Sequence, residues 1–221
     1  MGDSPVGRTE IGRIPERAVS DRKVIEAVLD EGLIAHVGLV VGEGEAAHPV
    51  VIPMLYARLG DSLLLHGSPA SRLLRAAKHG AEVCVTVTLL DGLVLARSAM
   101  HHSMNYRSVV VFGQATEVTD WGDKVTALDA LTDHVVPGRM AELRPHIDKE
   151  VRATTVVSLS LEECSMKART GPPVDDAEDM DADVWAGVLP LGLTPGLPEA
   201  DPLMPPMDVP EQITAWSRRT L

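Results

Sequence analysis

The feature that most constrains the fold is the stretch of residues 48–80, HPVVIPMLYARLGDSLLLHGSPASRLLRAAKHG. β-Branched residues open it, Gly60-Asp61 is a turn signal, and residues 62–66 form a second short apolar run. Small residues follow, with Pro69 at the expected first position of a helix, and leucines and alanines then recur at helical spacing. The stretch therefore predicts a strand, a turn, a strand, a small-residue loop and a helix.

The loop in this stretch has the parts of an anion site. Gly67 allows close approach of the backbone, and Ser68 and Ser71 add hydroxyl groups. Arg72 adds a planar set of donors that suits phosphate, and a helix start adds free N–H groups. An ordinary capped helix on a surface has the same local sequence. The local pattern alone leaves a phosphate site and a capped helix both open.

The charge of the chain is unevenly distributed. The 221 residues carry a formal net charge of −12, yet the segment from Val51 to Phe112 carries +3 and the remainder −15. A cationic segment within an acidic protein favours a small anionic ligand, and the overall charge argues against nucleic acid as a partner.

The chain has the features of a cytoplasmic protein that does not enter a membrane. No run of 18 apolar residues exists, and the start MGDSPVGRTEIGRIPER is polar. Cys84 and Cys164 do not form a CxxC spacing, so we expect free thiols in a reducing compartment.

The rest of the chain predicts a mainly β protein with peripheral helices. Short apolar runs and hairpin turns such as Asp91-Gly92 outnumber helical patterns, and regular βαβ alternation is missing. This pattern favours a barrel of six to eight largely antiparallel strands. We expect strands over 33–41, 83–90, 93–96, 106–118 and 154–161, and helices over 21–32 and 123–134.

Composition divides the chain into three parts. Residues 1–20 are predicted to be a flexible arm and residues 21–170 the barrel domain. Residues 171–221 form an acidic and Pro-rich extension, which cannot build a core of its own. We expect the segment around Trp185 to pack on the barrel or on a partner subunit, and disorder beyond Pro195.

The densest polar chemistry lies in residues 97–108, RSAMHHSMNYRS. His101 and His102 would point to opposite sides of an extended chain, and no carboxylate or cysteine lies at a matching spacing, so no metal centre is predicted. The GxSxG, HExxH, P-loop and GxGxxG patterns do not occur, which gives no support to hydrolase, zinc-protease or Rossmann functions.

With these residues the sequence resembles the pyridoxamine 5′-phosphate oxidase-like family of flavin-binding split barrels. The branch it resembles includes flavin-nucleotide-binding and nitroimidazole-resistance proteins. The resemblance covers about residues 13–193 and rests on RIPERAVSDR, VVIPMLYAR, LLLHGSPASRLL, TVTLLDGLVLARSAMHHSMNYRSVVVFG, ARTGPPVDD and WAGVLPL.

The resemblance implies an FMN site shared by the two subunits of a homodimer. It implies a strand along the flavin ring at Val51, Ile52, Pro53 and Met54, and a phosphate loop made by His66, Gly67, Ser68, Ser71 and Arg72. It further implies that Thr88, Leu89, Arg107 and Ser108 lie near the flavin. The basic residue that follows the Ser-Arg pair in the oxidases is Leu73 here, so one phosphate contact is missing.

The resemblance implies an FMN-dependent oxidoreductase acting on a small molecule. The Arg- and Trp-containing end of true pyridoxamine phosphate oxidases has no convincing counterpart, although Trp216 and Arg218 are present, so oxidation of vitamin B6 is not expected. His66, His101 and His102 are the candidate proton donors. Two alternatives stay open: a haem protein with an axial ligand from the 101–102 pair, and a non-catalytic flavin carrier or sensor.

Overall fold

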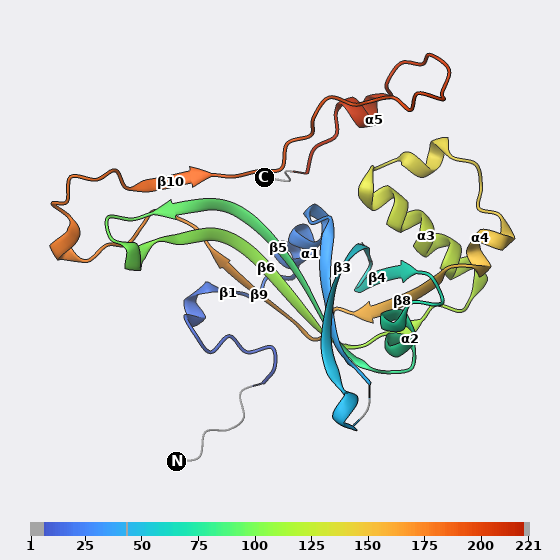
Figure 1. The fold of residues 1–221 in the computed structure, drawn as a ribbon, viewed down its shortest axis with the longest axis horizontal. Coiled ribbons are helices and arrows are strands. Elements are labelled where there is room, and N and C mark those ends of the chain that lie inside the picture. The colour runs from blue at the N-terminus through green and yellow to red at the C-terminus, as the bar shows by residue number, and fades with distance from the viewer. Residues whose placement is uncertain (1–6, 43, 219–221) are drawn as a thin grey trace.

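The computed structural model describes residues 7–42 and 44–218, and these residues fold mainly into one β-sheet (Figure 1). All strand pairs are antiparallel. The strands are β1 (Ala18–Val19), β2 (Ile34–Val41), β3 (His48–Leu59), β4 (Ser62–Gly67), β5 (Glu82–Leu95), β6 (Ser103–Gln114), β7 (Thr116–Glu117), β8 (Thr155–Ser160), β9 (Cys164–Arg169) and β10 (Gly187–Pro190).

The order of the strands makes an open, curled sheet. The order is β1-β9-β6-β5-β2-β3-β4-β8-β7, and β10 pairs with β5. Only Ala115 separates β6 from β7, so one stretch of chain passes from the middle of the sheet to its far edge. The predicted split-barrel class is confirmed, but the described residues form ten strands rather than six to eight. Two-residue strands such as β1 and β7 carry no periodic signal, and β10 lies in the Pro-rich extension.

The described residues form five α-helices: α1 (Arg22–Glu31), α2 (Arg72–Lys78), α3 (Trp121–Val135), α4 (Asp148–Arg152) and α5 (Glu211–Thr214). Single turns of 3₁₀ helix lie at Pro15–Arg17, Gly44–Ala46, Ala99–His101, Arg139–Glu142 and Ala177–Asp179. Asp21 and Asp120 begin α1 and α3, because each carboxylate accepts a hydrogen bond from a backbone N–H of the first turn. Within the described residues, no helix is both long and apolar enough to cross a membrane.

The strand β4 is buried on both faces. Leu63 and Leu65 belong to the main core between the sheet and α1. Leu64 faces the other way and packs with Ala127 and Leu131 of α3. The uninterrupted leucine run is therefore explained by two layers, one on each side of the strand.

Two local predictions were wrong. Asp91-Gly92 is not a hairpin turn but a bulge within the single long strand β5, and the hairpin turns instead at residues 96–102. A Cβ on Gly92 would lie 3.0 Å from the Leu189 carbonyl oxygen, so glycine serves here to let β10 approach. The helix α2 begins at Arg72 rather than at Pro69, because the Ser71 hydroxyl accepts from the Leu74 N–H and caps it.

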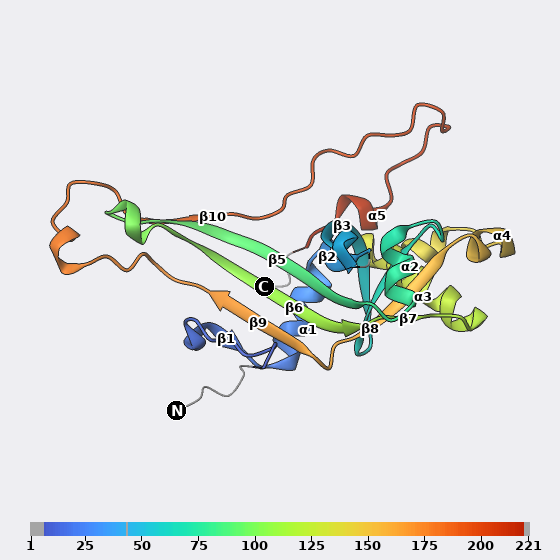
Figure 2. The ribbon, with the colours of Figure 1, turned by 60° about the horizontal axis from the view of Figure 1, so that its bottom comes forward.

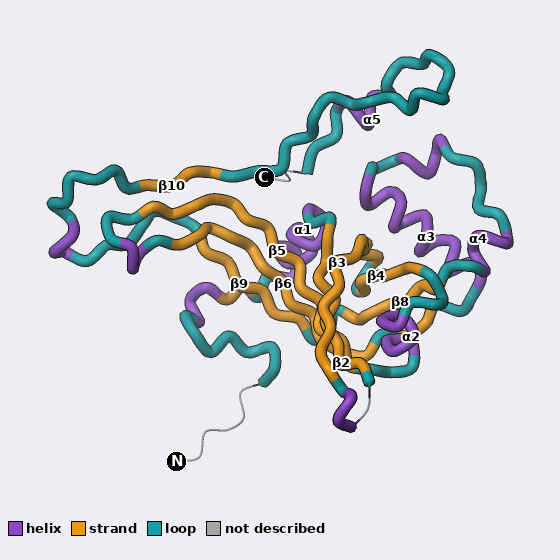
Figure 3. The backbone as a smooth tube through the Cα atoms, viewed as in Figure 1, coloured by secondary structure: helices purple, strands orange, loops and turns teal. Residues whose placement is uncertain are grey.

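The C-terminal extension runs back along the barrel of its own chain. Figure 3 shows it as long loops on either side of β10, and Figure 2 shows it spanning much of the molecule. Near its end the Trp216 indole N–H donates to the Val135 carbonyl (2.8 Å), and Arg218 donates to the Asp30 carbonyl (2.8 Å). The extension therefore contacts both α3 and α1. At the other end of the chain, β1 pairs with β9.

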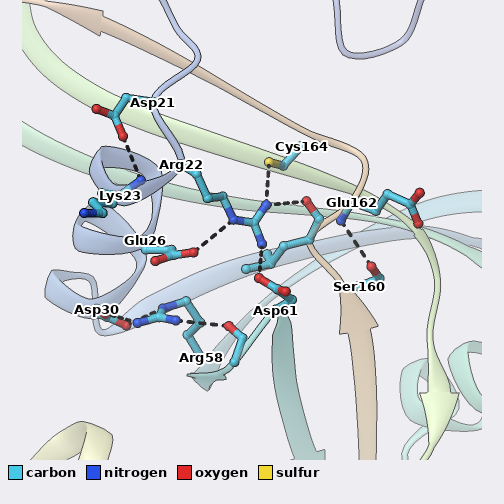
Figure 4. Close-up of polar contacts among 12 residues, drawn as sticks. Asp21, Arg22, Lys23, Glu26, Asp30, Arg58, Asp61, Ser160, Glu162 and Cys164 are labelled. Carbon is cyan, nitrogen blue, oxygen red and sulfur yellow. Dashed lines mark hydrogen bonds and ion pairs between the residues drawn. The ribbon is translucent and has the colours of Figure 1, made fainter.

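A polar cluster made by Arg22 and its partners Glu26, Asp61 and Leu161 connects α1 with the turns beside it (Figure 4). The Arg22 guanidinium donates to the carboxylates of Glu26 (3.0 Å) and Asp61 (2.9 Å) and to the Leu161 carbonyl (2.8 Å). It thus connects α1 with the β3–β4 turn and with the chain leaving β8.

We predict that Arg22→Ala lowers the free energy of unfolding by about 1–2 kcal/mol, because it removes several charge-assisted hydrogen bonds between separate elements. Chemical denaturation measures the change. Lys23→Ala is the matched control, since the exposed neighbouring side chain makes no such bonds. Equal losses in the two variants would contradict the role given to the cluster.

Candidate functional site

The segment from His66 to Arg72 is fixed by the strand before it and the helix after it. His66 and Gly67 end β4 and pair with β8. The Ser68 hydroxyl accepts from the Ala70 N–H (3.2 Å), and the Ser68 carbonyl accepts from the Ser71 N–H (2.9 Å). The loop therefore stabilises its own turn. Because α2 has only seven residues, the charge available at this loop comes from arginine side chains rather than from the helix end.

Two arginines on α2 are available for an anion. The side chains of Arg72 and Arg75 are exposed and form no hydrogen bond or ion pair with the described residues. Both line an open groove of about 660 Å³, whose other walls are the end of β2 and residues 79–81. This groove is the most cationic part of the predicted phosphate region.

The predicted flavin-facing strand presents apolar side chains to solvent. Val51 is 64% exposed and Ile52 42% exposed, Pro53 is exposed, and Met54 is half-buried against the core. The register with β2 pairs Val51 with Gly38 and Ile52 with Val37. Because side chains alternate along a strand, Val51 and Ile52 lie on opposite faces of β3, and among the described residues both stay partly open to solvent.

His66 lies in a pocket on the α3 side of the sheet. Strand alternation places it on the same face as Leu64, which packs against α3. The pocket has a volume of about 340 Å³, and its remaining lining is Leu55, Leu128, Leu131, Thr132, Val135, Val136, Arg139 and His146. The His66 Nδ1 atom is buried without a hydrogen-bond partner, and burial lowers the pKa of this histidine below its usual value. His66 therefore lines a mostly apolar cavity, and one of its ring nitrogens is buried without a hydrogen-bond partner.

Arg107 is occupied within the protein. Its guanidinium donates to both carboxylate oxygens of Glu31 (2.6 and 2.9 Å) and of Asp91 (2.9 and 2.7 Å). These two carboxylates raise its pKa. The structure gives Arg107 the role of a cross-link between α1, β5 and β6, and two acids neutralise its charge.

The remaining predicted flavin neighbours lie beside this cross-link. The hydroxyls of Thr88 and Ser108 are 2.8 Å apart. Thr88 and Leu89 line a small cavity of about 150 Å³ that the extension also lines, through Leu191, Leu193 and Arg218. These residues are therefore near one another but are not part of the groove at Arg72.

His101 and His102 lie at the tip of the β5–β6 hairpin, at the opposite end of the molecule from β4 (Figure 1). The His101 Nε2 atom is 3.0 Å from an Asp176 carboxylate oxygen, and this contact raises the pKa of His101. Asp179 joins them, and the three potential ligand atoms lie within 4.8 Å of one another. The His102 Nδ1 atom bonds the Ser98 carbonyl (2.8 Å). The structure does not bring either histidine together with His66.

Sequence reasoning missed three parts of the site. Arg75 follows Arg72 by three residues, and this spacing indicates that both side chains lie on one face of a helix. The pocket walls at Leu128 and Val135 had no such signal, because apolar residues on a helix indicate burial without showing what they cover. The contact of Trp216 with α3 depends on a long-range path of the extension.

Comparison with known proteins identifies the family. The family model for pyridoxamine 5′-phosphate oxidase matches residues 21–168, which is more than half of the chain. This chain belongs to the pyridoxamine 5′-phosphate oxidase family. The resemblance inferred from the sequence is thereby confirmed. A search of the curated proteins found no match.

Two solved structures are similar over nearly the whole chain. The FAD and haem binding protein from Mycobacterium smegmatis is 39% identical, with a TM-score of 0.84, over 90% of this chain and 96% of that one. The flavocytochrome Anf3 from Azotobacter vinelandii is 40% identical, with a TM-score of 0.87, over 98% and 99%. Both shares are too large to stop at residue 170, so both likenesses reach into the C-terminal extension.

A more distant structure shares the fold alone. It is described as a putative 5-nitroimidazole antibiotic resistance protein from Bacteroides thetaiotaomicron and is 23% identical with a TM-score of 0.56. The similarity covers 68% of this chain and 85% of that one.

We predict that burial of His66 makes stability depend on pH. The unfolded chain takes up a proton at His66 near pH 6.5, whereas the folded protein does so only at lower pH. The free energy of unfolding therefore decreases as the pH falls below about 6.5. Denaturation midpoints between about pH 7 and about pH 5 measure this loss. His66→Gln should make the decline shallower, while His102→Gln at the hairpin tip should leave it unchanged. An identical decline in wild type and His66→Gln would refute the assignment.

Proposed function

We propose that this protein is a redox protein that binds a flavin and a haem and acts on a small molecule. One observation carries the haem part of this proposal: His66, which has a ring nitrogen without a hydrogen-bond partner, lines the mostly apolar cavity under α3. The two nearly full-length relatives, one named as an FAD and haem binding protein and the other as a flavocytochrome, support it.

The pocket beneath α3 fits a haem by the chemistry of its lining. Iron takes a neutral imidazole as an axial ligand, and burial holds His66 in that form. Leu128, Leu131 and Val135 supply apolar walls, which exclude water from the ligand. Thr132, Arg139 and His146 are polar members of the lining besides His66, and Arg139 and His146 are already paired with Glu142 (2.5 Å) and Asp129 (2.8 Å) of the chain.

The opposite side of the same segment fits a flavin. Arg72 would bind the flavin phosphate through its free guanidinium, beside the Ser68 turn. Val51, which is 64% exposed, offers an apolar side chain to a flat ring. FMN, which the sequence resemblance implied, meets these requirements, and so does FAD.

The two cofactors would supply electron chemistry, since flavins exchange one or two electrons and haem iron exchanges one. The residues of the chain hold them on either side of one short segment and limit the access of water. His66, neutral and facing an apolar cavity, suits iron ligation better than proton donation. The histidines at the hairpin tip have no place in either cofactor site.

We further propose a homodimer with the flavin at the subunit contact. The face of the sheet that turns away from the core carries exposed Ile34 and Val40 of β2, Val51 of β3 and Leu90 of β5. Exposed apolar residues on one face of a sheet are typical of a subunit interface.

Reciprocal variants test the cofactor assignment. We predict that the wild type purifies with a flavin spectrum and a Soret band. His66→Ala should lose the Soret band and retain flavin, and Arg72→Ala should lose most of its flavin on dilution and retain the Soret band. His102→Ala is the control and should retain both. Loss of haem in His102→Ala or His101→Ala, with full haem in His66→Ala, would overturn the ligand assignment.

A single charge should separate the two subunits. We predict that Val51→Glu converts a dimer to a monomer, because it buries a carboxylate in an apolar contact. Light scattering at micromolar concentration measures the mass. Val174→Glu, which changes a still more exposed valine on the extension, should remain dimeric. A monomeric wild type would count against the shared site.

A further inference from the structure

We infer that the end of the C-terminal extension, residues 211–218, is a strap that holds the end of α3 and limits access to the cavity under that helix. Trp216 and Arg218 are its positioning residues, since neither of them lines the cavity. The part of the inference that concerns haem rests on the proposed function, whereas the fixing of α3 does not.

The strap bonds the last turn of α3 directly. The Trp216 indole N–H donates to the Val135 carbonyl oxygen (2.8 Å), and the Arg218 guanidinium donates to the same oxygen (3.3 Å). A helix leaves its last carbonyl groups without partners inside the helix, so these two donors satisfy one of them. Val135 also lines the cavity. The strap therefore holds a residue of the cavity wall.

One guanidinium joins the ends of two helices. Besides Val135 of α3, Arg218 donates to the Asp30 carbonyl oxygen at the end of α1 (2.8 Å). The last turn of α1 has no basic residue of its own and finishes with Asp30 and Glu31. Because the C-terminal end of a helix carries partial negative charge, a cation shared by both ends is stabilising there. Loss of Arg218 would therefore loosen the end of α3 from the end of α1.

The strap is held by few contacts and can open while the barrel stays folded. Within residues 194–210, the hydrogen bonds of the described residues stay inside the extension, and Leu197 and Leu203 are 93% and 91% exposed. The Arg218 Nε atom is buried without a partner among the described residues, which offsets part of the gain from the two carbonyl bonds. Segments with few buried contacts open locally at low cost.

Hydrogen exchange of the full chain tests the strap without any cofactor assignment. We expect Arg218→Ala to increase amide exchange over residues 131–136 about tenfold and Trp216→Phe about threefold, because each removes a donor to the Val135 carbonyl. Trp216→Phe keeps an aromatic ring and loses only the N–H. Trp185→Phe is the matched control, since Trp185 lies on the same extension, is 66% exposed and forms no hydrogen bond with the described residues.

The dependence of exchange on urea separates local opening from unfolding of the whole chain. Local opening exposes little surface, so exchange over residues 131–136 of the wild type should change little at low urea concentrations. Exchange in β8, in the middle of the fold, should rise steeply with urea.

Transfer of haem to apomyoglobin, followed in the Soret band, tests the access to the cavity. We expect transfer about tenfold faster from Arg218→Ala and about threefold faster from Trp216→Phe than from the wild type, because a loosened α3 opens the cavity more often. Transfer from Trp185→Phe should stay within about twofold of the wild type.

The outcomes separate this inference from the proposed function. Exchange over residues 131–136 that is unchanged in Arg218→Ala, or that rises with urea as steeply as in β8, would overturn the strap. Haem transfer at the wild-type rate from Arg218→Ala would overturn its control of access. A wild type without a Soret band would overturn the haem part of the proposed function, and exchange over residues 131–136, which belong to the cavity wall, would still decide the inference.

Discussion

The strand β4, buried on both faces, is the constraint on which the rest of the site depends. Leu63 and Leu65 lie in the main core, and Leu64 packs under α3. A shift of one residue would move each leucine to the wrong layer, so the register of β4 is fixed. The next residue on the α3 face is His66, and its placement in the pocket is a direct consequence of that register.

The same constraint places two candidate sites beside one short segment. His66 faces the apolar pocket under α3, and Arg72, six residues later, faces an open cationic groove. The Ser68 turn reverses the chain between them and is held by its own hydrogen bonds. Because only five residues separate the two anchors, groups bound to them would lie close to one another, which is what electron transfer between two cofactors needs.

The sequence predicted the elements with strong periodicity and missed those set by distant contacts. Asp21 and Gly32 marked α1 correctly, since capping is local. Asp91-Gly92 was taken for a turn because a local pattern cannot show that β10 lies against Gly92. Arg107 was expected near the flavin, but its pairing with Glu31 and Asp91 depends on the approach of three separate elements. His66 and Arg72 were selected from the sequence, whereas the pocket under α3 required the fold.

The central claim is that His66 binds the iron of a haem in the pocket under α3, next to a flavin held at Arg72. An anomalous difference map at the iron edge, from crystals of the protein as purified, tests it most directly. The account predicts one iron peak per chain, within bonding distance of a His66 nitrogen, with flavin density against Val51 and Arg72. An iron peak at the hairpin tip beside His101, or a pocket filled by ordered water alone, would contradict it.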